Sequence, residues 1–388
     1  MASPPEDQKN PAALSILQDS GPPEGSTDYT TVVLLHGFAW HSGIFAKLVP
    51  LAHAHNARVV LVNRRDYPGA TPFSPEERSL LSAIATESAS SPESDAAAAH
   101  AHAQLEPFMR SRAREVSDLL ARLVHDANIP KSQREASKGG LVLVGWSFST
   151  VWMTAFLAHA PALHAGEGEG EVDLTQYLRR VVLLDPPYHV LGFPPPPDPY
   201  NPLFDSSIAP ADRARAFAHW VSGYFVHHTD ALDSTSASPS ERERPAAAAL
   251  ERRAYLPSPP PTLSTLTPDE VARALYPSPG APGGSDALLL AGGMRSGTFA
   301  TLRDEALAVP ADEGLRAVEV RHVWCDRSVW ETTWTSWNLR WMFEEARQKS
   351  ERLREVTWVK LQGANHFVHW DEPERILVAL LTDSVEKY

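Results

Sequence analysis

Nine residues of the chain read Leu141-Val142-Leu143-Val144-Gly145-Trp146-Ser147-Phe148-Ser149. An apolar run here meets a short turn around Ser147, and a helical pattern follows through residue 159. A G-x-S-x-G turn of this kind holds its serine between a strand and a helix, where small neighbours are needed because the backbones approach closely. Ser149 stands in place of the last glycine. The stretch predicts a nucleophilic Ser147, although a serine at a helix start can also be a simple N-cap.

Short apolar runs recur along the chain, and longer segments with helical spacing separate them. The runs are rich in Val and Leu on both faces, which is typical of parallel strands covered by helices on both sides. The sequence therefore predicts an α/β fold with a mostly parallel sheet. The expected strands are residues 31–35, 58–62, 141–144, 180–184, 317–323 and 357–361, with a possible first strand at residues 13–17.

Composition divides the chain into four parts. Residues 1–30 are rich in Pro, Ser and Gly and predict a flexible N-terminal arm, while residues 31–185 and 313–388 form the two parts of the core. Residues 186–312 are dense in proline and interrupt the alternation, so we expect a partly helical cap or lid insertion. Residues 214–225 predict an amphipathic helix whose aromatic face includes Phe217 and Trp220. We expect this face to cover Ser147.

A glycine follows the strand expected at residues 31–35. Gly37 lets the next backbone N–H groups turn toward a substrate oxygen, so the N–H groups of Phe38 and Phe148 are the expected oxyanion-hole donors. The alternative is an ordinary turn at the end of a strand, in which His36 is a packing residue.

A histidine-containing loop lies between the strand expected at residues 357–361 and the last helix. A catalytic histidine needs such a loop at the carboxyl end of the sheet, where its imidazole can reach the serine while a carboxylate holds the other nitrogen. His366 occupies this position and is the predicted base. His369, near the helix start, is the weaker candidate, because it could equally form a local hydrogen bond.

Two aspartates end strands between Ser147 and His366 in the chain, which is the order this arrangement requires. Asp326 follows the strand next before the histidine strand, the commoner position, and is the predicted acid. Asp185 follows the strand at residues 180–184 and is the alternative acid; it could instead begin the insertion.

Aromatic residues supply the expected substrate pocket. Trp330 begins a stripe with Trp334, Trp337 and Trp341 at helical spacing, which favours packing of a helix on the sheet. Only Trp330, nearest the strand end, is expected close to the site. The predicted pocket residues are Trp146, Phe217, Trp220 and Trp330.

Together these elements resemble the α/β-hydrolase fold family over residues 31–381, apart from the insertion. The resemblance implies that Ser147 is the nucleophile, that His366 is the base and acid, that Asp326 orients it, and that Phe38 and Phe148 are the oxyanion donors. Epoxide hydrolases and haloalkane dehalogenases of this fold carry Asp where Ser147 stands, so the chain is unlike them. The matching pieces are residues 34–38 (Leu-Leu-His-Gly-Phe), 63–69 (Asn-Arg-Arg-Asp-Tyr-Pro-Gly), 145–149, Asp326 and residues 365–369 (Asn-His-Phe-Val-His).

The predicted function is a serine hydrolase that cleaves an ester-like bond of a small, apolar substrate through an acyl-enzyme. A carboxylesterase, lipase, thioesterase or C–C bond hydrolase fits equally well. We expect no metal and no organic cofactor. The alternative is a non-catalytic ligand-binding protein of the same fold.

Composition narrows the expected partners and compartment. A formal charge of −13 gives no basic surface for nucleic acid, and Cys325 is the only cysteine, so the chain forms no intrachain disulfide. The N-terminus lacks an apolar signal region, and no run approaches the roughly 18 apolar residues that span a bilayer. We therefore expect a cytoplasmic protein that acts on a small molecule, without stable membrane insertion.

Overall fold

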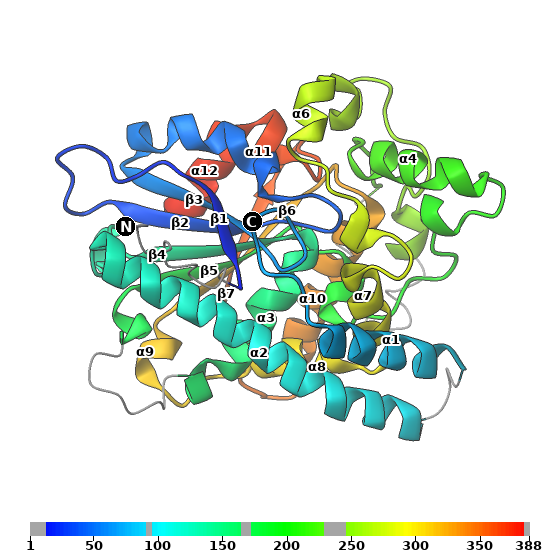
Figure 1. The fold of residues 1–388 in the computed structure, drawn as a ribbon, viewed down its shortest axis with the longest axis horizontal. Coiled ribbons are helices and arrows are strands. Elements are labelled where there is room, and N and C mark those ends of the chain that lie inside the picture. The colour runs from blue at the N-terminus through cyan, green and yellow to red at the C-terminus, as the bar shows by residue number, and fades with distance from the viewer. Residues whose placement is uncertain (1–12, 91–94, 164–171, 229–245, 384–388) are drawn as a thin grey trace, which may run out of the picture.

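The chain forms one seven-stranded sheet in the computed structural model, which describes residues 13–90, 95–163, 172–228 and 246–383 (Figure 1). The strand order is β1-β3-β2-β4-β5-β6-β7. Only β1 is antiparallel to its neighbour, so the predicted α/β fold with a mostly parallel sheet is confirmed. The strands are β1 (Ser15–Asp19), β2 (Thr30–Leu35), β3 (Ala57–Asn63), β4 (Leu141–Trp146), β5 (Leu178–Leu184), β6 (Glu319–Cys325) and β7 (Val356–Leu361).

The two faces of the sheet bury separate apolar clusters, because successive side chains of a strand point to opposite faces. Val33 and Leu35 of β2 join one cluster, and Val32 and Leu34 join the other. Figure 1 shows the corresponding helical layers on either side of the sheet. The first cluster includes α1 (Pro75–Ser90), α2 (Asp95–Ala127), α3 (Thr150–Leu163), α7 (Ser285–Arg295) and α8 (Thr298–Leu307); the second includes η1 (Ser42–Leu51), α10 (Trp330–Gln348), α11 (Val368–Asp371) and α12 (Pro373–Leu381).

The described part of the N-terminal arm packs against the core. Strand β1 pairs with β3, and Asp19 forms an ion pair with Arg58 at 2.5 Å. Leu14 and Tyr29 are buried in the first cluster. Residues 13–29 thus contact the core through β1, Leu14 and Tyr29, while Ile16 and Leu17 of β1 are exposed. Residues 1–12 lie outside the described residues.

The segment between β5 and β6 does not pack as one unit. Helices α7 and α8 pack against α1 and α3, within the layer that covers the first face, whereas α4 lies against η7 and η9. Residues 229–245 of this segment lie outside the described residues. Its other elements are η6 (Tyr188–Leu191), η7 (Pro202–Phe204), α4 (Pro210–Val221), η9 (Thr262–Thr265), α6 (Pro268–Ala272) and η10 (Ser278–Gly280), and α9 (Glu313–Arg316) follows before β6.

Helix α4 is shorter than the sequence predicts. It ends at Val221, so Tyr224 and Phe225 lie beyond it. The chain leaves the helix after its C-cap, Ser222, and the Phe225 N–H then donates to Arg327 O at 2.8 Å instead of to a helical carbonyl. A tertiary hydrogen bond to the loop after β6 thus replaces the last turn of the expected helix.

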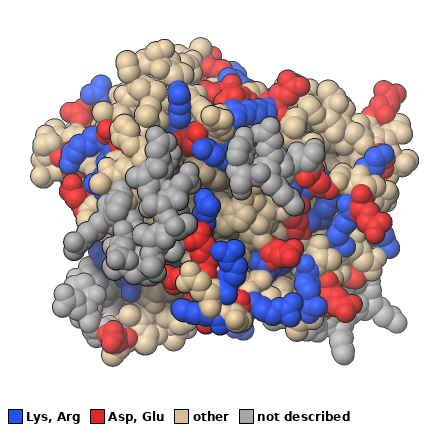
Figure 2. Space-filling model, turned by 180° about the vertical axis from the view of Figure 1, so that it is seen from behind, with Lys and Arg blue, Asp and Glu red and all other residues tan. Residues whose placement is uncertain are grey.

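The surface carries charges of both signs. On the face drawn in Figure 2, the described residues place Lys and Arg side chains among Asp and Glu without a wide area of either sign. Within the described ranges, none of the helices is both long and apolar enough to cross a bilayer. The remaining short helices, all of the 3₁₀ type, are η2 (His53–His55), η3 (Arg134–Ala136), η4 (Ser147–Ser149) and η5 (Leu174–Gln176).

Candidate active site

Ser147 occupies a strained turn between β4 and α3. Its φ is 55°, in the left-handed region that non-glycine residues seldom adopt and that costs on the order of 1–3 kcal/mol. A Cβ on Gly145 would lie 2.5 Å from Met153 Cγ and 2.6 Å from Ser149 O, so only glycine fits there. The turn therefore has the geometry expected from the sequence, with Ser147 at the carboxyl edge of the sheet.

Ser149, which replaces the last glycine of the motif, makes a contact that glycine could not make. Its Oγ donates to the carbonyl oxygen of His36, and its side chain is fully buried. The serine is small enough for the close approach at this turn. It also ties the turn around Ser147 to the segment that follows β2.

His366 lies in the loop after β7 and contacts Asp185. Its Nδ1 is 2.6 Å from Asp185 Oδ2, and the two residues are 3% and 0% exposed. Asp185 also accepts hydrogen bonds from the Cys325 N–H at 3.0 Å and the Ser328 hydroxyl at 2.6 Å. With Nδ1–H donating to this carboxylate, His366 has Nε2 left to accept a proton.

Asp326, the predicted acid, does not make this contact. Its carboxylate accepts from the Gly363 N–H at 2.6 Å and lies 3.4 Å from Lys360 Nζ. The expected pairing of Asp326 with His366 is therefore wrong, and the alternative, Asp185, makes it. The reason is the sheet order: β5 lies next to β4, and Asp185, with a φ of 47°, turns at its end between the serine strand and β7. Asp326 instead stabilises the start of the histidine loop.

Trp146 connects the serine turn with the histidine loop. Its indole N–H donates to His366 O at 3.0 Å, and the two ring centroids are 5.0 Å apart. Because Trp146 directly precedes Ser147, this contact places the turn and the loop side by side at the carboxyl edge of the sheet. The structure thus brings three sequence-predicted residues, Ser147, His366 and Asp185, to one edge.

The two predicted oxyanion donors also lie together. The rings of Phe38 and Phe148 meet edge to face, with centroids 5.7 Å apart. Among the described residues, no backbone carbonyl accepts a hydrogen bond from the Phe38 N–H. A Cβ on Gly37 would lie 3.1 Å from Ser147 Cβ, so the segment after β2 passes directly against the serine turn. An oxyanion hole requires N–H donors beside the serine that no protein carbonyl occupies, and the Phe38 N–H meets this requirement.

The comparison with protein families agrees with this geometry. The sequence model described as "Alpha/beta hydrolase family" matches residues 32–379. The chain belongs to this family. A search of curated proteins returned no significant match.

Solved structures match the chain at low identity and with low TM-scores. A monoacylglycerol lipase from Paleococcus ferrophilus is 13% identical, over 94% of this chain and 96% of its own, with a TM-score of 0.39. A bromoperoxidase from Bacillus anthracis is 16% identical over 94% of each chain, with a TM-score of 0.41. An epoxide hydrolase from Vigna radiata is 15% identical over 93% of this chain and 91% of its own, with a TM-score of 0.39.

The predicted pocket residues have mostly structural contacts. The Trp220 indole donates to Arg252 O at 2.7 Å, and its ring packs near Phe217 and Tyr200 within the insertion. Trp330 stacks on Tyr188 and donates to Tyr200 O at 2.8 Å. In the described part of this alpha/beta hydrolase, none of the hydrogen bonds and ring contacts of these residues involves Ser147. Their place in a substrate pocket therefore stays a prediction.

His369 and Cys325 fill space beside the site. Burial, and next the neighbouring His366, lowers the pKa of His369 well below its usual range, and neither ring nitrogen has a hydrogen-bond partner among the described residues. Its ring packs 4.4 Å from that of Trp146. Burial raises the pKa of the Cys325 thiol, so this cysteine is not an activated nucleophile. Among the described residues, no cluster of His, Cys, Asp or Glu could hold a metal ion.

Sequence reasoning missed four residues around the site. Ser328 was not singled out, although it follows Asp326 by two positions and its hydroxyl donates to Asp185. Arg64 and Tyr67 belong to the 63–69 loop that carries part of the family resemblance, but no role was assigned to them. Asp286 lies in the insertion, and the sequence around it does not indicate its role, because its partners are more than 200 residues away in the chain.

Proposed function

We propose that this alpha/beta hydrolase is a serine hydrolase that cleaves an ester-like bond of a small, apolar substrate through an acyl-enzyme. The observation that carries the proposal is the buried hydrogen bond between His366 Nδ1 and Asp185 Oδ2, beside a serine held in a strained strand-to-helix turn. Nucleophilic catalysis needs a nucleophile, a base and a carboxylate that orients the base, and the hydrogen bond between His366 and Asp185 supports the last two of these roles.

In this mechanism each residue of the site has a defined role. Ser147 Oγ attacks the carbonyl carbon, and His366 Nε2 takes the hydroxyl proton. The Phe38 and Phe148 N–H groups stabilise the oxyanion, the bond to the leaving group breaks, and His366 returns the proton to it. Water then attacks the acyl-enzyme by the same route. Asp185 holds the imidazole in the required tautomer and stabilises the imidazolium.

An apolar substrate is supported by the surroundings of the serine. Ser147 is only 8% exposed, and the residues on either side of it in the chain, Trp146 and Phe148, are aromatic and buried. A site that excludes water favours apolar acyl or alcohol groups, at about 25 cal/mol for each Å² of apolar surface buried. We expect para-nitrophenyl butyrate or hexanoate to be cleaved faster than the acetate. Cytoplasmic localisation stays a prediction from the sequence.

The nucleophile is tested by covalent labelling. A fluorophosphonate probe should label the wild-type protein at Ser147, identified by mass spectrometry of the modified peptide. The Ser147→Ala variant should not be labelled and should lose several powers of ten in ester hydrolysis while unfolding at an unchanged temperature. Ser149→Ala, two residues away, controls for loss of a neighbouring hydroxyl and should still be labelled.

The alternative function, a ligand-binding protein without catalysis, makes the opposite prediction. A serine that is not activated should react with the probe no faster than an exposed surface serine. Failure of wild-type labelling, with the protein folded, would favour this alternative over the hydrolase.

A further inference from the structure

Three buried side chains lie behind the predicted oxyanion donor Phe38. Both oxygens of Asp286 accept hydrogen bonds from Arg64, at 2.7 Å each, and Oδ2 also accepts from the Tyr67 hydroxyl at 2.6 Å. The side chains of Arg64 and Asp286 are 1% and 2% exposed. Arg64 and Tyr67 follow β3, whereas Asp286 lies in the first turn of α7 in the insertion. We refer to Arg64, Tyr67 and Asp286 as the Asp286 clamp.

Arg64 holds the peptide group before Phe38. Its Nη2 donates to Gly37 O at 3.0 Å, and its Nε donates to His36 O at 3.3 Å. In a trans peptide, the carbonyl and the following N–H point in opposite directions. A hydrogen bond from Arg64 to Gly37 O therefore directs the Phe38 N–H away from Arg64, and Gly37 itself packs against Ser147.

Tyr67 holds the peptide group after Phe38. The Ala39 N–H donates to the Tyr67 hydroxyl oxygen at 3.0 Å. Ala39 has a φ of 62°, so the chain turns sharply here and needs a partner to hold it. Both peptide groups that flank Phe38 are thus bound by residues that share one carboxylate, that of Asp286.

The protonation states of Tyr67, Arg64 and His36 determine which atom donates in each of these hydrogen bonds. Burial raises the pKa of Tyr67 well above its usual range, so its hydroxyl keeps the proton that it donates to Asp286. Burial alone would lower the pKa of Arg64, but the ion pair with Asp286 raises it, so the guanidinium stays charged. Burial, and next the charge of Arg64, lowers the pKa of His36, which is neutral. His36 Nε2 accepts a hydrogen bond from the backbone N–H of Arg64 at 3.1 Å. The proton of the neutral His36 ring is therefore on Nδ1, which donates to Gly37 O at 3.0 Å.

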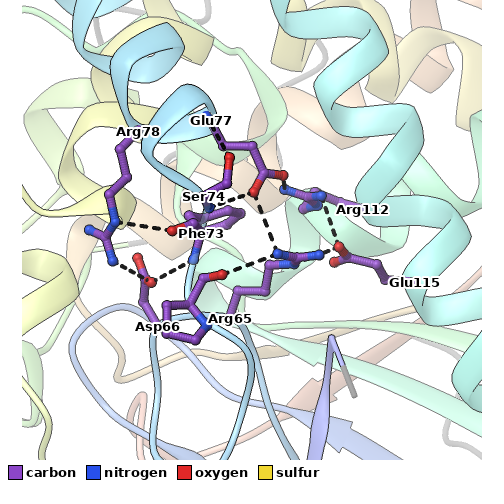
Figure 3. A network of polar contacts seen from close by, with 9 residues as sticks. Arg65, Asp66, Phe73, Ser74, Glu77, Arg78, Arg112 and Glu115 are labelled. Atoms are coloured by element: carbon purple, nitrogen blue, oxygen red, sulfur yellow. Dashed lines mark hydrogen bonds and ion pairs between the residues drawn. The ribbon is translucent and has the colours of Figure 1, made fainter. Parts of the chain in front are cut away.

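The loop that carries Arg64 and Tyr67 is tied to the helical layer (Figure 3). Arg65 Nε donates to Glu115 Oε1 at 2.6 Å, which links the loop to α2. Asp66 accepts from the Phe73 N–H at 2.9 Å and from Arg78 at 2.6 Å, which links it to α1. The backbone of the loop is therefore held without the insertion, and Asp286 adds the contact that orients the Arg64 and Tyr67 side chains.

The insertion also covers the segment around Phe38 directly. The Tyr276 N–H donates to Ala39 O, and the His41 N–H donates to Ala274 O, each at 2.8 Å. A Cβ on Gly280 would lie 2.7 Å from Phe38 Cε1. The segment around Phe38 is thus enclosed between the loop after β3 and residues 274–286 of the insertion.

We propose that Arg64, Tyr67 and Asp286 are positioning residues that hold the Phe38 N–H toward the oxygen of the acyl group on Ser147. Helix α7 of the insertion thereby controls oxyanion stabilisation through Asp286. This inference rests on the serine hydrolase function proposed above. Loosening the clamp removes stabilisation of the tetrahedral intermediate, whereas binding of the planar ester is unaffected, so kcat should fall without a change in KM.

The test compares Asp286→Asn and Arg64→Lys with wild type. We expect kcat for para-nitrophenyl butyrate to fall about ten- to hundredfold, less than the 10²–10³ lost with a whole oxyanion donor, and KM to stay within about twofold. The inhibition constant of phenylboronic acid, which forms a tetrahedral adduct on the serine, should rise by the same factor as kcat falls. A merely structural role would not link these two readouts.

The matched control is Arg180→Lys. Arg180 is a fully buried arginine near the start of the interior strand β5, at the amino ends of the parallel strands and away from Ser147, where it pairs with Glu319 at 2.6 Å and donates to a backbone carbonyl. We expect this variant to lower the unfolding temperature as much as Arg64→Lys does, but to leave kcat and the boronate inhibition constant unchanged.

Each possible result supports or overturns the proposed function, the clamp inference or both. If wild-type Ser147 forms no fluorophosphonate or boronate adduct, the proposed function fails, and the clamp inference fails with it. If wild type is active but Asp286→Asn keeps its kcat and boronate affinity, only the clamp inference is overturned. If Asp286→Asn does not fold, Tyr67→Phe replaces it, because this variant keeps the ion pair and removes only the hydroxyl; an unchanged kcat would again overturn the inference.

Discussion

At the residue scale, Asp185 ends β5 beside His366 and accepts three hydrogen bonds. Asp185→Asn should lower kcat by on the order of 10⁴, because an amide at this position favours the wrong imidazole tautomer. Asp326→Asn should cost much less, since that carboxylate contacts Gly363 and Lys360. Steady-state kinetics with a para-nitrophenyl ester measure both, and thermal unfolding shows that each variant is folded. A larger loss in Asp326→Asn would return the role to Asp326.

A second residue, Glu331 at the start of α10, destabilises the folded protein when its buried carboxyl group is ionised. Burial raises its pKa to about 7, while a hydrogen bond from Asn201 acts in the opposite direction. An unfolded glutamate titrates near 4.5, so the folded state is penalised as the pH rises from 4.5 to 7, and the penalty is constant above that.

Glu331→Gln should therefore be more stable than wild type at pH 8, by up to about 3 kcal/mol, and the difference should vanish below pH 4.5. The glutamine keeps an oxygen that accepts from Asn201. Urea unfolding of the two proteins across this pH range measures the difference. Equal stability at pH 8 would mean that the folded protein ionises Glu331 without cost.

At the scale of elements, Trp220 anchors α4 to the rest of the insertion, whereas the other aromatic residue of the helix, Phe217, contributes less. Trp220 is 2% exposed and donates to Arg252 O, whereas Phe217 on the same helix is half-buried. Trp220→Ala should cost about 3–5 kcal/mol of unfolding free energy by opening a cavity, and Phe217→Ala should cost clearly less. Urea denaturation checks the ranking. Similar losses in both variants would show that α4 packs as a uniform face.

At the scale of the whole molecule, Asn365 joins the insertion to the histidine loop. Its Nδ2 donates to Ser222 O at 2.9 Å and to Thr262 Oγ1 at 2.8 Å, and its neighbour in the chain is His366. Asn365→Ala frees this loop from the insertion, so we expect kcat/KM for an ester to fall roughly ten- to hundredfold through misplacement of His366.

Tyr224→Phe serves as the control for Asn365→Ala. It removes one hydrogen bond at the same junction, that of the Tyr224 hydroxyl to Asp371 at 2.7 Å, and leaves both hydrogen bonds of Asn365 in place. Its kcat/KM should stay close to wild type. Equal losses in the two variants would indicate a general loosening of the insertion rather than a specific effect on His366.

The amino-acid sequence by itself determined the strands, the serine turn and the histidine loop. Each depends on near neighbours: a buried parallel strand needs apolar residues on both faces, and a serine elbow needs small residues beside it. The expected strands at residues 31–35, 58–62 and 357–361 accordingly lie within β2, β3 and β7.

Only the tertiary structure decided which aspartate meets His366 and what lies behind Phe38. Asp185 and Asp326 both end strands, and the choice depends on the order β4-β5-β6-β7, which places β5 beside the serine strand. Asp286 meets Arg64 across 222 positions of sequence. Packing of the insertion against the loop after β3 creates this contact, and no periodicity or motif within either segment specifies it, because hydrogen bonds between distant segments form only once the layers are packed.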